Sequence, residues 1–300
     1  MLSETEWELV ELSISQQAKK KKHPEEKGKD RLVWDSKIVV GGKGLEESKF
    51  SSPSCISYVD NLLYVLDTGN QRVQIFNSIG SFSKSIPLKS PMQSKYNSLF
   101  VDKDTKDIYV TDPTTNCILV FNQAGERVSV LTEIENQDSY LESPGGIFFQ
   151  SKSATMVVTD KAGHCVMILD AKGRILRLFG SEGSGKSEFN QPTGVFVNSW
   201  GQILVADTNN SRVQVFSQEG FYAFQFGNNL LLKPVGLYVD QQDCVYVADV
   251  GREKVFVFDP FGRLLYHINA NLAFPISVAF DEKEERIIVC EQVTNRVQFF

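Results

Sequence analysis

The chain has 300 residues, of which 42% are hydrophobic and 23% are charged. This length allows one large domain or two of average size, with a substantial hydrophobic core. The formal net charge of −6 argues against a general nucleic-acid binder, and we expect no binding to DNA, because affinity for phosphates comes mainly from clustered Lys and Arg side chains.

The N-terminal segment lacks the features of a secretory signal. Residues 1–22 are first acidic and then basic, with no basic stretch that leads into an apolar core. No apolar run reaches the length that spans a membrane. The five cysteines are widely spaced and include no C-x-x-C pair, which argues against a disulfide framework and a zinc module. We therefore expect a cytoplasmic protein that is not bound to a membrane.

Residues 1–30 are expected to form a flexible or partly helical arm. Ser3 and Glu6 are spaced as a capping box at the start of a short helix. The later part of the arm, AKKKKHPEEKGK, has the composition of a solvated linker, although its lysine run also fits a nuclear-import or nucleic-acid-binding tail. The arm is predicted to precede a single folded domain over residues 31–300.

Six repeats follow the arm. Each contains a strand that ends in an acidic residue, a polar turn and a second strand, as in ILVADTNNSRVQVF. Successive acidic residues lie 45, 48, 47, 42 and 42 positions apart, which is the length of a four-stranded propeller blade. The acidic residues are Asp67, Asp112, Asp160, Asp207, Asp249 and Glu291.

The other parts of each repeat predict two more strands. A short apolar strand precedes the acidic residue and begins with Pro, except in the second repeat, where Tyr96 takes its place. A turn that ends in Gly follows in the first five repeats, because Gly adopts the positive φ that such hairpins need. The sixth repeat ends at Phe300 without its fourth strand. We expect residues 31–42 to supply that strand, close the ring and protect two sheet edges. The predicted fold is all-β, a six-bladed β-propeller of four-stranded antiparallel blades.

The fourth repeat, FNQPTGVFVNSWGQILVADTNNSRVQVFSQEGFYAFQFG, resembles an NHL repeat. The first, fifth and sixth repeats are similar to it, and the second and third match loosely. The resemblance is to the NHL domains of RING and tripartite-motif proteins and extends over roughly residues 31–300. It implies that the propeller recognises a protein or peptide, often as the substrate-recognition end of a ubiquitin ligase. The paired Cys and His residues of a RING are absent, so we expect no ligase activity from this chain.

The predicted function is a non-catalytic interaction module or scaffold, with no catalytic residue, cofactor or metal, and with a monomeric propeller. The loops between the second and third strands emerge on one face together with the linkers between blades, and loops on a rigid scaffold commonly carry binding residues. The candidate residues on this face are Asn70, Gln71, Lys95, Tyr96, Thr114, Thr115, Asn116, Lys161, His164, Asn209, Asn210, Lys233, Arg252, Thr294 and Asn295.

The resemblance also implies a second interpretation, because some NHL propellers bind RNA on this face. A subset of the candidates would then combine positive charge with an aromatic residue that stacks on bases. This subset is Lys95, Tyr96, Lys161, His164, Lys233 and Arg252.

Three local motifs have structural interpretations that we prefer to functional ones. The pair Asp207 and Arg212 recurs in most repeats, so we expect it to hold a turn. Residues 180–187, GSEGSGKS, match a phosphate-binding loop in letters, but no helix is predicted to follow them. The segment TDKAGH resembles a zinc-ligand motif of peptidyl-hydroxyglycine lyases, with His164 as the matching histidine. The other repeats offer no histidine at this position, and a zinc site needs about three protein ligands.

Overall fold

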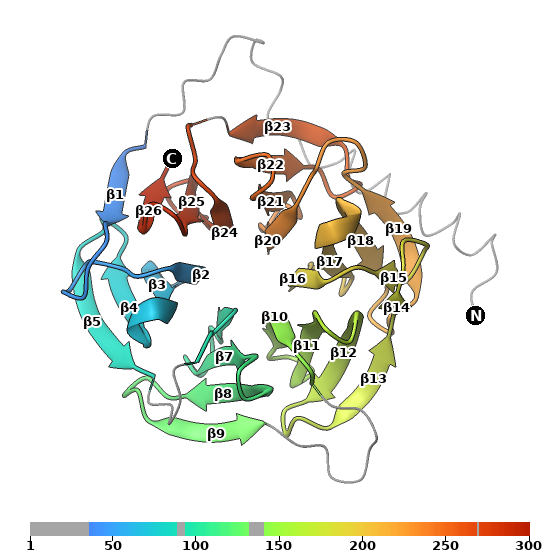
Figure 1. Ribbon diagram of the computed structural model, residues 1–300, viewed down its shortest axis with the longest axis horizontal. Helices are drawn as coiled ribbons and strands as arrows, with labels where there is room; N and C mark the ends of the chain where they lie inside the picture. Colours follow the sequence, from blue (N-terminus) through green and yellow to red (C-terminus); the bar gives the residue numbers. More distant parts are fainter. Residues whose placement is uncertain (1–35, 89–93, 132–140, 269) are drawn as a thin grey trace. The chain divides into compact units, whose positions relative to one another are not determined.

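The computed structural model describes residues 36–88, 94–131, 141–268 and 270–300, and these form a closed ring of six four-stranded antiparallel sheets (Figure 1). The predicted N-terminal arm of residues 1–30 lies outside the described residues. No helix in the described part of the chain is long and apolar enough to span a membrane.

The first three blades each run from an innermost to an outermost strand in chain order. The first blade contains β2 (Pro53–Val59), β3 (Leu62–Asp67), β4 (Arg72–Asn77) and β5 (Phe82–Pro87). The second contains β6 (Leu99–Val101), β7 (Ile108–Asp112), β8 (Cys117–Phe121) and β9 (Arg127–Leu131). The third contains β10 (Pro144–Gln150), β11 (Thr155–Asp160), β12 (Cys165–Asp170) and β13 (Ile175–Phe179).

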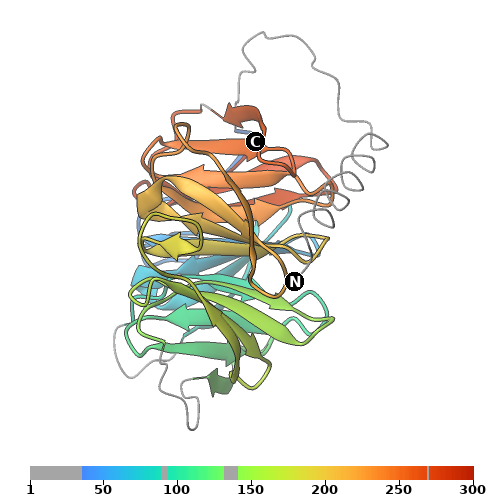
Figure 2. The same ribbon diagram turned by 90° about the vertical axis from the view of Figure 1, so that its right-hand side faces the viewer.

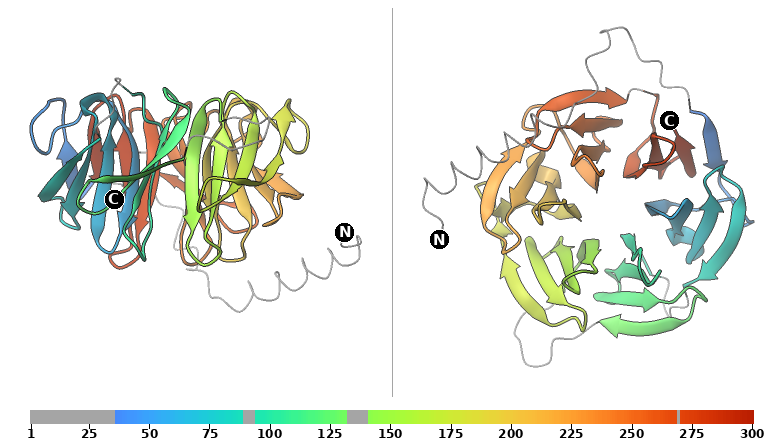
Figure 3. Two further views of the ribbon diagram at one scale, coloured as in Figure 1. Left: turned by 90° about the horizontal axis from the view of Figure 1, so that it is seen from below. Right: turned by 180° about the vertical axis from the view of Figure 1, so that it is seen from behind.

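The fourth and fifth blades follow the same order. The fourth contains β16 (Pro192–Val197), β17 (Ile203–Asp207), β18 (Arg212–Phe216) and β19 (Tyr222–Phe226). The fifth contains β20 (Pro234–Val239), β21 (Val245–Asp249), β22 (Lys254–Phe258) and β23 (Leu264–Ile268). The ring of blades is visible edge-on in Figure 2 and from two further directions in Figure 3.

The sixth blade is completed by the N-terminal strand, as predicted. Its sheet order is β1-β26-β25-β24, with β24 (Pro275–Asp281), β25 (Arg286–Glu291) and β26 (Arg296–Phe299) from the C-terminal end of the chain. β1 (Ile38–Gly41) pairs antiparallel with β26, from Ile38 opposite Phe299 to Gly41 opposite Arg296. The ring is therefore closed by hydrogen bonds between the two ends of the propeller.

The hydrophobic core lies between neighbouring blades. Six clusters of buried side chains are present in the described residues, and each joins two successive blades around the ring. The two middle strands of each blade are almost wholly buried because both their faces pack against neighbouring sheets. Their β-branched and aromatic residues suit such positions. The blades thus form a rigid frame around the central axis.

Two kinds of turn connect the strands. The predicted glycine turns before the outermost strands have φ values from 78° to 84°, at Gly80, Gly125, Gly173, Gly220 and Gly262. The turns between the second and third strands bring the chain back to the end at which the innermost strand begins, because Pro53 pairs with Asp67 and Pro192 with Asp207. We call this end of the ring the loop face.

Candidate functional site

The Asp–Arg pairs belong to the frame of the propeller. The guanidinium of Arg212 donates to Asp207 and to the carbonyls of Gly185 and Glu188, while Asp207 accepts the backbone N–H of Asn190. Arg72 and Asp67 make the equivalent ion pair in the first blade, and Arg296 and Glu291 in the sixth. Each pair therefore fastens a turn, and in the first and fourth blades it also fastens the preceding linker.

Several predicted binding residues serve turn geometry. The last residue of each turn between the second and third strands has a positive φ, from 52° to 57°. Asn and His tolerate this conformation better than most residues. The residues at this position are Gln71, Asn116, His164, Ser211, Glu253 and Asn295. Four of them, Gln71, Asn116, His164 and Asn295, are on the predicted list.

Other predicted residues bind the propeller itself. Asn70 and Asn210 donate to Asp67 and Asp207, and Thr115 donates to Asp112. Thr114 accepts the backbone N–H of Lys95, and Asn209 donates to Asn190. The hydroxyl oxygen of Thr294 is buried and makes no hydrogen bond within the described residues. Apart from Thr294, these polar residues therefore make hydrogen bonds within the propeller, and their polarity needs no external binding partner to explain it.

The remaining predicted residues lie in different environments. Lys95, Lys233 and Arg252 are exposed on the loop face. Tyr96 is only 2% exposed, and its ring fills space in the core between the first and second blades. It therefore cannot stack on a base, as the RNA-binding interpretation required. His164 Nδ1 lies 3.2 Å from the carbonyl oxygen of Phe189. The described residues contain no group of three His, Cys, Asp or Glu side chains that could hold a metal.

The phosphate-loop match is a linker, as expected. Within it, β14 (Ser181–Glu182) pairs in parallel with β15 (Glu188–Phe189), and the next element is the innermost strand β16. No helix opens from this segment, so the backbone geometry of a phosphate-binding loop is not formed.

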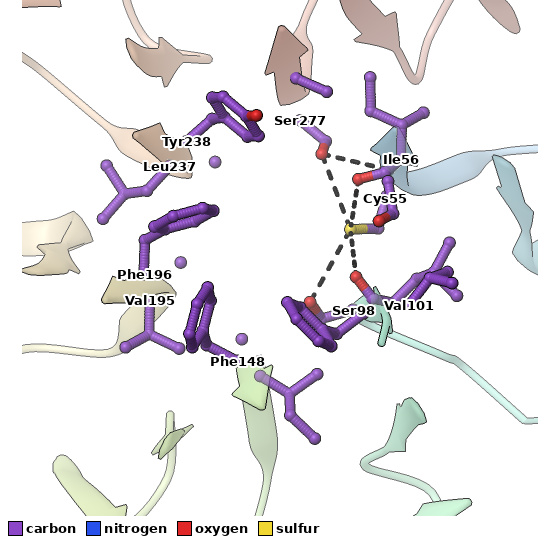
Figure 4. A pocket seen from close by; sticks show the side chains of 18 of the residues that line it. Cys55, Ile56, Ser98, Val101, Phe148, Val195, Phe196, Leu237, Tyr238 and Ser277 are labelled. Carbon is purple, nitrogen blue, oxygen red and sulfur yellow. Dashed lines mark hydrogen bonds between the residues drawn. The ribbon is translucent and has the colours of Figure 1, made fainter. Parts of the chain in front are cut away.

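The hollow of the ring is a cavity of about 1240 Å³, lined by the innermost strands of all six blades (Figure 4). Most of these strands carry an irregularity in pairing just after their first residue, for example between Pro192 and Val195. Such bulges redirect side chains. The cavity is larger than most small-molecule pockets, so it can hold a substantial ligand.

Four aromatic rings form one wall of the cavity. They occupy the same position in the second to fifth blades: Phe100, Phe148, Phe196 and Tyr238. Neighbouring ring centroids are 5.0, 4.7 and 5.2 Å apart, within the range of favourable aromatic contacts. The equivalent residues of the first and sixth blades are the small Ser57 and Ala279. The aromatic surface therefore covers one side of the cavity only.

A second position also varies around the ring, and it separates the third, fourth and fifth blades from the other three. In the third, fourth and fifth blades it is glycine, because the next blade is too close for a side chain: a Cβ on Gly194 would lie 2.3 Å from the carbonyl oxygen of Val235. In the other blades the position holds Cys55, Ser98 and Ser277. Ser277 accepts the backbone N–H of Ile56, and Cys55 Sγ lies 3.6 Å from the carbonyl oxygen of Leu99. Figure 4 shows these polar side chains across the cavity from Phe148, Phe196 and Tyr238.

Lys161 reaches this cavity from the loop face. It follows Asp160, at the position that holds Thr68 and Thr208 in other blades. Gly145 lies beneath its stem, since a Cβ there would be 3.2 Å from Lys161 Cγ. The amine lies 3.4 Å from Oδ1 of Asn97 on the neighbouring blade and forms no ion pair within the described residues. Burial lowers the pKa of Lys161 below its ordinary value, because the charged form loses solvation.

Sequence reasoning identified Lys161 but missed the cavity around it. The aromatic residue recurs at the fifth position, and the glycine at the third, of three segments that start with Pro: PGGIFF, PTGVFV and PVGLYV. These two columns of the repeat were the available signal. We interpreted both columns only as signs of a strand. The alternation of apolar residues in a strand does not indicate which side chains point into the cavity and which into the core between blades.

The comparisons with known proteins agree with the fold. The model of the NHL repeat matches residues 50–76 and 189–216, which lie in the first and fourth blades. A comparison with curated protein sequences gave no match.

Solved structures similar to this chain include three of lyases. Virginiamycin B lyase from Staphylococcus aureus is 15% identical, with a TM-score of 0.61, and covers 83% of this chain and 94% of its own. A streptogramin B lyase is also 15% identical, with a TM-score of 0.66, and covers 90% of this chain and 89% of its own. A catalytically inactive variant of the Staphylococcus aureus enzyme with quinupristin has a TM-score of 0.59 at 15% identity, with 83% and 84% covered.

These neighbours correct the prediction of a non-catalytic interaction module, since they are enzymes with this fold. That prediction came from the resemblance to the NHL domains of RING and tripartite-motif proteins and from the lack of a local catalytic motif in the sequence. A channel at the centre of a propeller takes its side chains from several blades, so a site there leaves no local motif. The fold itself is settled by the six blades and by the two matched repeats. The chain is a six-bladed β-propeller whose first and fourth blades match the NHL repeat.

Proposed function

We propose that the chain is an enzyme of the lyase type, which binds an apolar or aromatic substrate in the central cavity and removes a proton from it with the amine of Lys161. The observation that carries this proposal is the position of that amine, inside a cavity with an aromatic wall and without a carboxylate partner in the described residues. The similar lyases support the reaction class, while at 15% identity they support no residue roles.

Two features of Lys161 support its proposed role as a general base. A lysine with an ordinary pKa is almost wholly protonated at neutral pH, and a protonated amine cannot accept a proton. Burial lowers the pKa of Lys161 and so increases the fraction of neutral amine. Asn97 fixes the amine, because its own Nδ2 donates to the carbonyl oxygen of Pro144 at 3.0 Å and holds the amide in place.

The reaction would be an elimination. The amine nitrogen takes a proton from a carbon atom beside an electron-withdrawing group such as a carbonyl. The electrons of the broken C–H bond form a new double bond, and the leaving group departs with the electrons of its own bond. The ammonium of Lys161 then holds the proton until the leaving group or solvent takes it. This sequence needs no oxidant, reductant or added water.

A neutral aromatic probe tests the proposal without knowledge of the natural substrate. 5-Nitrobenzisoxazole undergoes ring-opening elimination when a base removes its C–H proton, and its flat ring suits the aromatic wall. We expect saturable, pH-dependent acceleration by the wild-type protein and at least a hundredfold loss in Lys161→Gln, as for removal of a general base. Lys233→Gln is the matched control, because Lys233 is an exposed lysine on the loop face that does not line the cavity.

The outcome that contradicts the proposal is equal acceleration by the wild-type and Lys161→Gln proteins. The affinity of the cavity for the probe provides a second readout. Because Phe196 lies in the middle of the aromatic wall, Phe196→Ala should raise the KM for the probe more than it lowers kcat. A role of Lys161 in folding alone would change neither the pH profile nor the KM.

A further inference from the structure

The two mouths of the cavity differ in charge. At the loop face, the cavity is lined by Lys95 and Lys161 with no carboxylate among its described lining residues. At the opposite end, where the first and second strands of each blade are joined, it is lined by four carboxylates and two lysines. These are Asp60, Asp104, Asp240, Glu282, Lys103 and Lys152. The strand pairing fixes which end each residue occupies.

Three of the four carboxylates at the far mouth are held by the propeller itself. Asp240 accepts the backbone N–H groups of Gln242 and Cys244 and the hydroxyl of Tyr246. Glu282 accepts the N–H of Gln241, and Asp60 pairs with Lys106. Burial raises the pKa of both Asp240 and Glu282. Lys95 and Lys161 differ from these carboxylates, because neither amino group pairs with a carboxylate within the described residues.

The middle of the cavity has room for a flat ring. The aromatic wall lies on one side, and the facing residues of the first and sixth blades are small. A planar group can therefore contact Phe148, Phe196 or Tyr238 through its face or its edge, in the arrangements that aromatic pairs favour. The thiol and hydroxyls of Cys55, Ser98 and Ser277 lie opposite and are already engaged with one another or with the backbone.

From this arrangement we infer the substrate class: a flat aromatic compound that carries a carboxylate, bound with its ring on the aromatic wall and its carboxylate at Lys95. This inference depends on the proposed function, because only that function makes the bound compound a substrate. Lys95 supplies the positive charge, and Lys161, one blade away on the same mouth, is left free to act on a carbon beside the carboxylate. A cationic group would be unfavourable at this mouth because like charges would repel.

Three naphthalene probes that differ in charge test this inference. They are 2-naphthylacetate, 2-(2-naphthyl)ethanol and 2-(2-naphthyl)ethylamine, with affinities measured by isothermal titration calorimetry at low and high salt. We expect the acetate to bind up to about fivefold more tightly than the alcohol at low salt, the amount of an exposed ion pair. Lys95→Gln should remove this preference, and Lys233→Gln should retain it. Phe196→Ala should weaken all three by about tenfold.

Two outcomes overturn the inference: tightest binding of the amine, or an unchanged preference in Lys95→Gln. Absence of binding by all three probes also overturns it. The proposed function is tested separately, because 5-nitrobenzisoxazole carries no charge and its elimination requires Lys161 but not Lys95. A protein that accelerates the elimination and shows no preference for the acetate would keep the proposed function and lose the inferred substrate class.

Discussion

Nε of Arg212 lies 2.8 Å from Oδ2 of Asp207, and both side chains are buried, with 6% and 0% of their side-chain surface exposed. The same guanidinium reaches Gln225 on the outermost strand and two carbonyls of the linker that enters the blade. One ion pair therefore connects the turn, the linker and the edge of the blade. In the first blade, Arg72 and Asp67 repeat the pair, and Arg72 again reaches two linker carbonyls.

Arg212→Ala should strongly destabilise the propeller. It leaves the carboxylate of Asp207 buried without its cation, and breaking a buried pair costs about 3–5 kcal/mol. Urea unfolding followed by circular dichroism measures the change in the free energy of unfolding.

Arg174→Ala is the matched control for this ion pair. Arg174 also pairs with an aspartate, Asp170, but its side chain is 71% exposed. Exposed pairs contribute about 0–1 kcal/mol. Equal destabilisation by the two variants would contradict the view that burial gives the Arg212 pair its structural role.

Gly194→Ala should lower stability although its backbone is ordinary. The new Cβ would lie 2.3 Å from the carbonyl oxygen of Val235 on the next blade, and backbone atoms cannot move away as a side chain can. Overpacking of this kind costs about 1–3 kcal/mol. Gly185→Ala is the control, because a Cβ there would meet only the end of the Glu188 side chain, at 3.0 Å. Thermal unfolding of both variants distinguishes them, and similar melting temperatures would refute the close approach of blades.

The architecture could be predicted because the same sequence features recur from blade to blade. The acidic residue recurs in all six repeats, the glycine turn in five and the Arg in three, and comparison of the copies showed that the sixth lacks its fourth strand. The cavity could not be predicted in this way. Phe148 and Phe196 are neighbours only through the packing of successive blades, and a sequence alone does not state on which side of a strand the axis lies.

Two of the predicted binding residues show the same limit. Lys161 was predicted as a surface residue, and its path into the cavity depends on Gly145 beneath it and on Asn97 from another blade. Tyr96 was predicted as a binding-face residue whose aromatic ring could stack on RNA bases. Its ring instead packs between the first two blades, and its hydroxyl lies 3.5 Å from the carbonyl oxygen of Leu88. In both cases the direction of one side chain is set by residues distant in sequence.

Val40→Thr should destabilise the closed ring, and Val39→Thr should not. The two residues are neighbours in β1 and point to opposite faces, with Val40 5% and Val39 54% exposed. A threonine at Val40 would bury a hydroxyl among Phe50, Val297 and Phe299, at a cost of about 1–3 kcal/mol. Both substitutions preserve shape and strand propensity, so differential scanning calorimetry isolates the burial. Equal melting temperatures would argue against a structural role for the closing strand.

Lys161→Met should stabilise the protein at neutral pH, and the gain should shrink as the pH rises. Burial lowers the pKa of Lys161 from its ordinary value of 10.5, so between the two values the unfolded chain binds a proton that the folded protein does not. The free energy of unfolding of the wild type therefore increases with pH across this window. Below the lowered pKa both states are protonated, and the wild type carries the full cost of desolvating the ammonium.

Methionine removes this cost and retains the length of the side chain. Urea unfolding at several pH values from neutral to about 10 should show curves for wild type and Lys161→Met that converge as the pH increases. Lys233→Met, at an exposed position of the same face, should run parallel to the wild type. Parallel curves for Lys161→Met as well would mean that the amine of Lys161 is solvated. The wild type would then lose no stability at this position, and no function would be needed to explain such a loss.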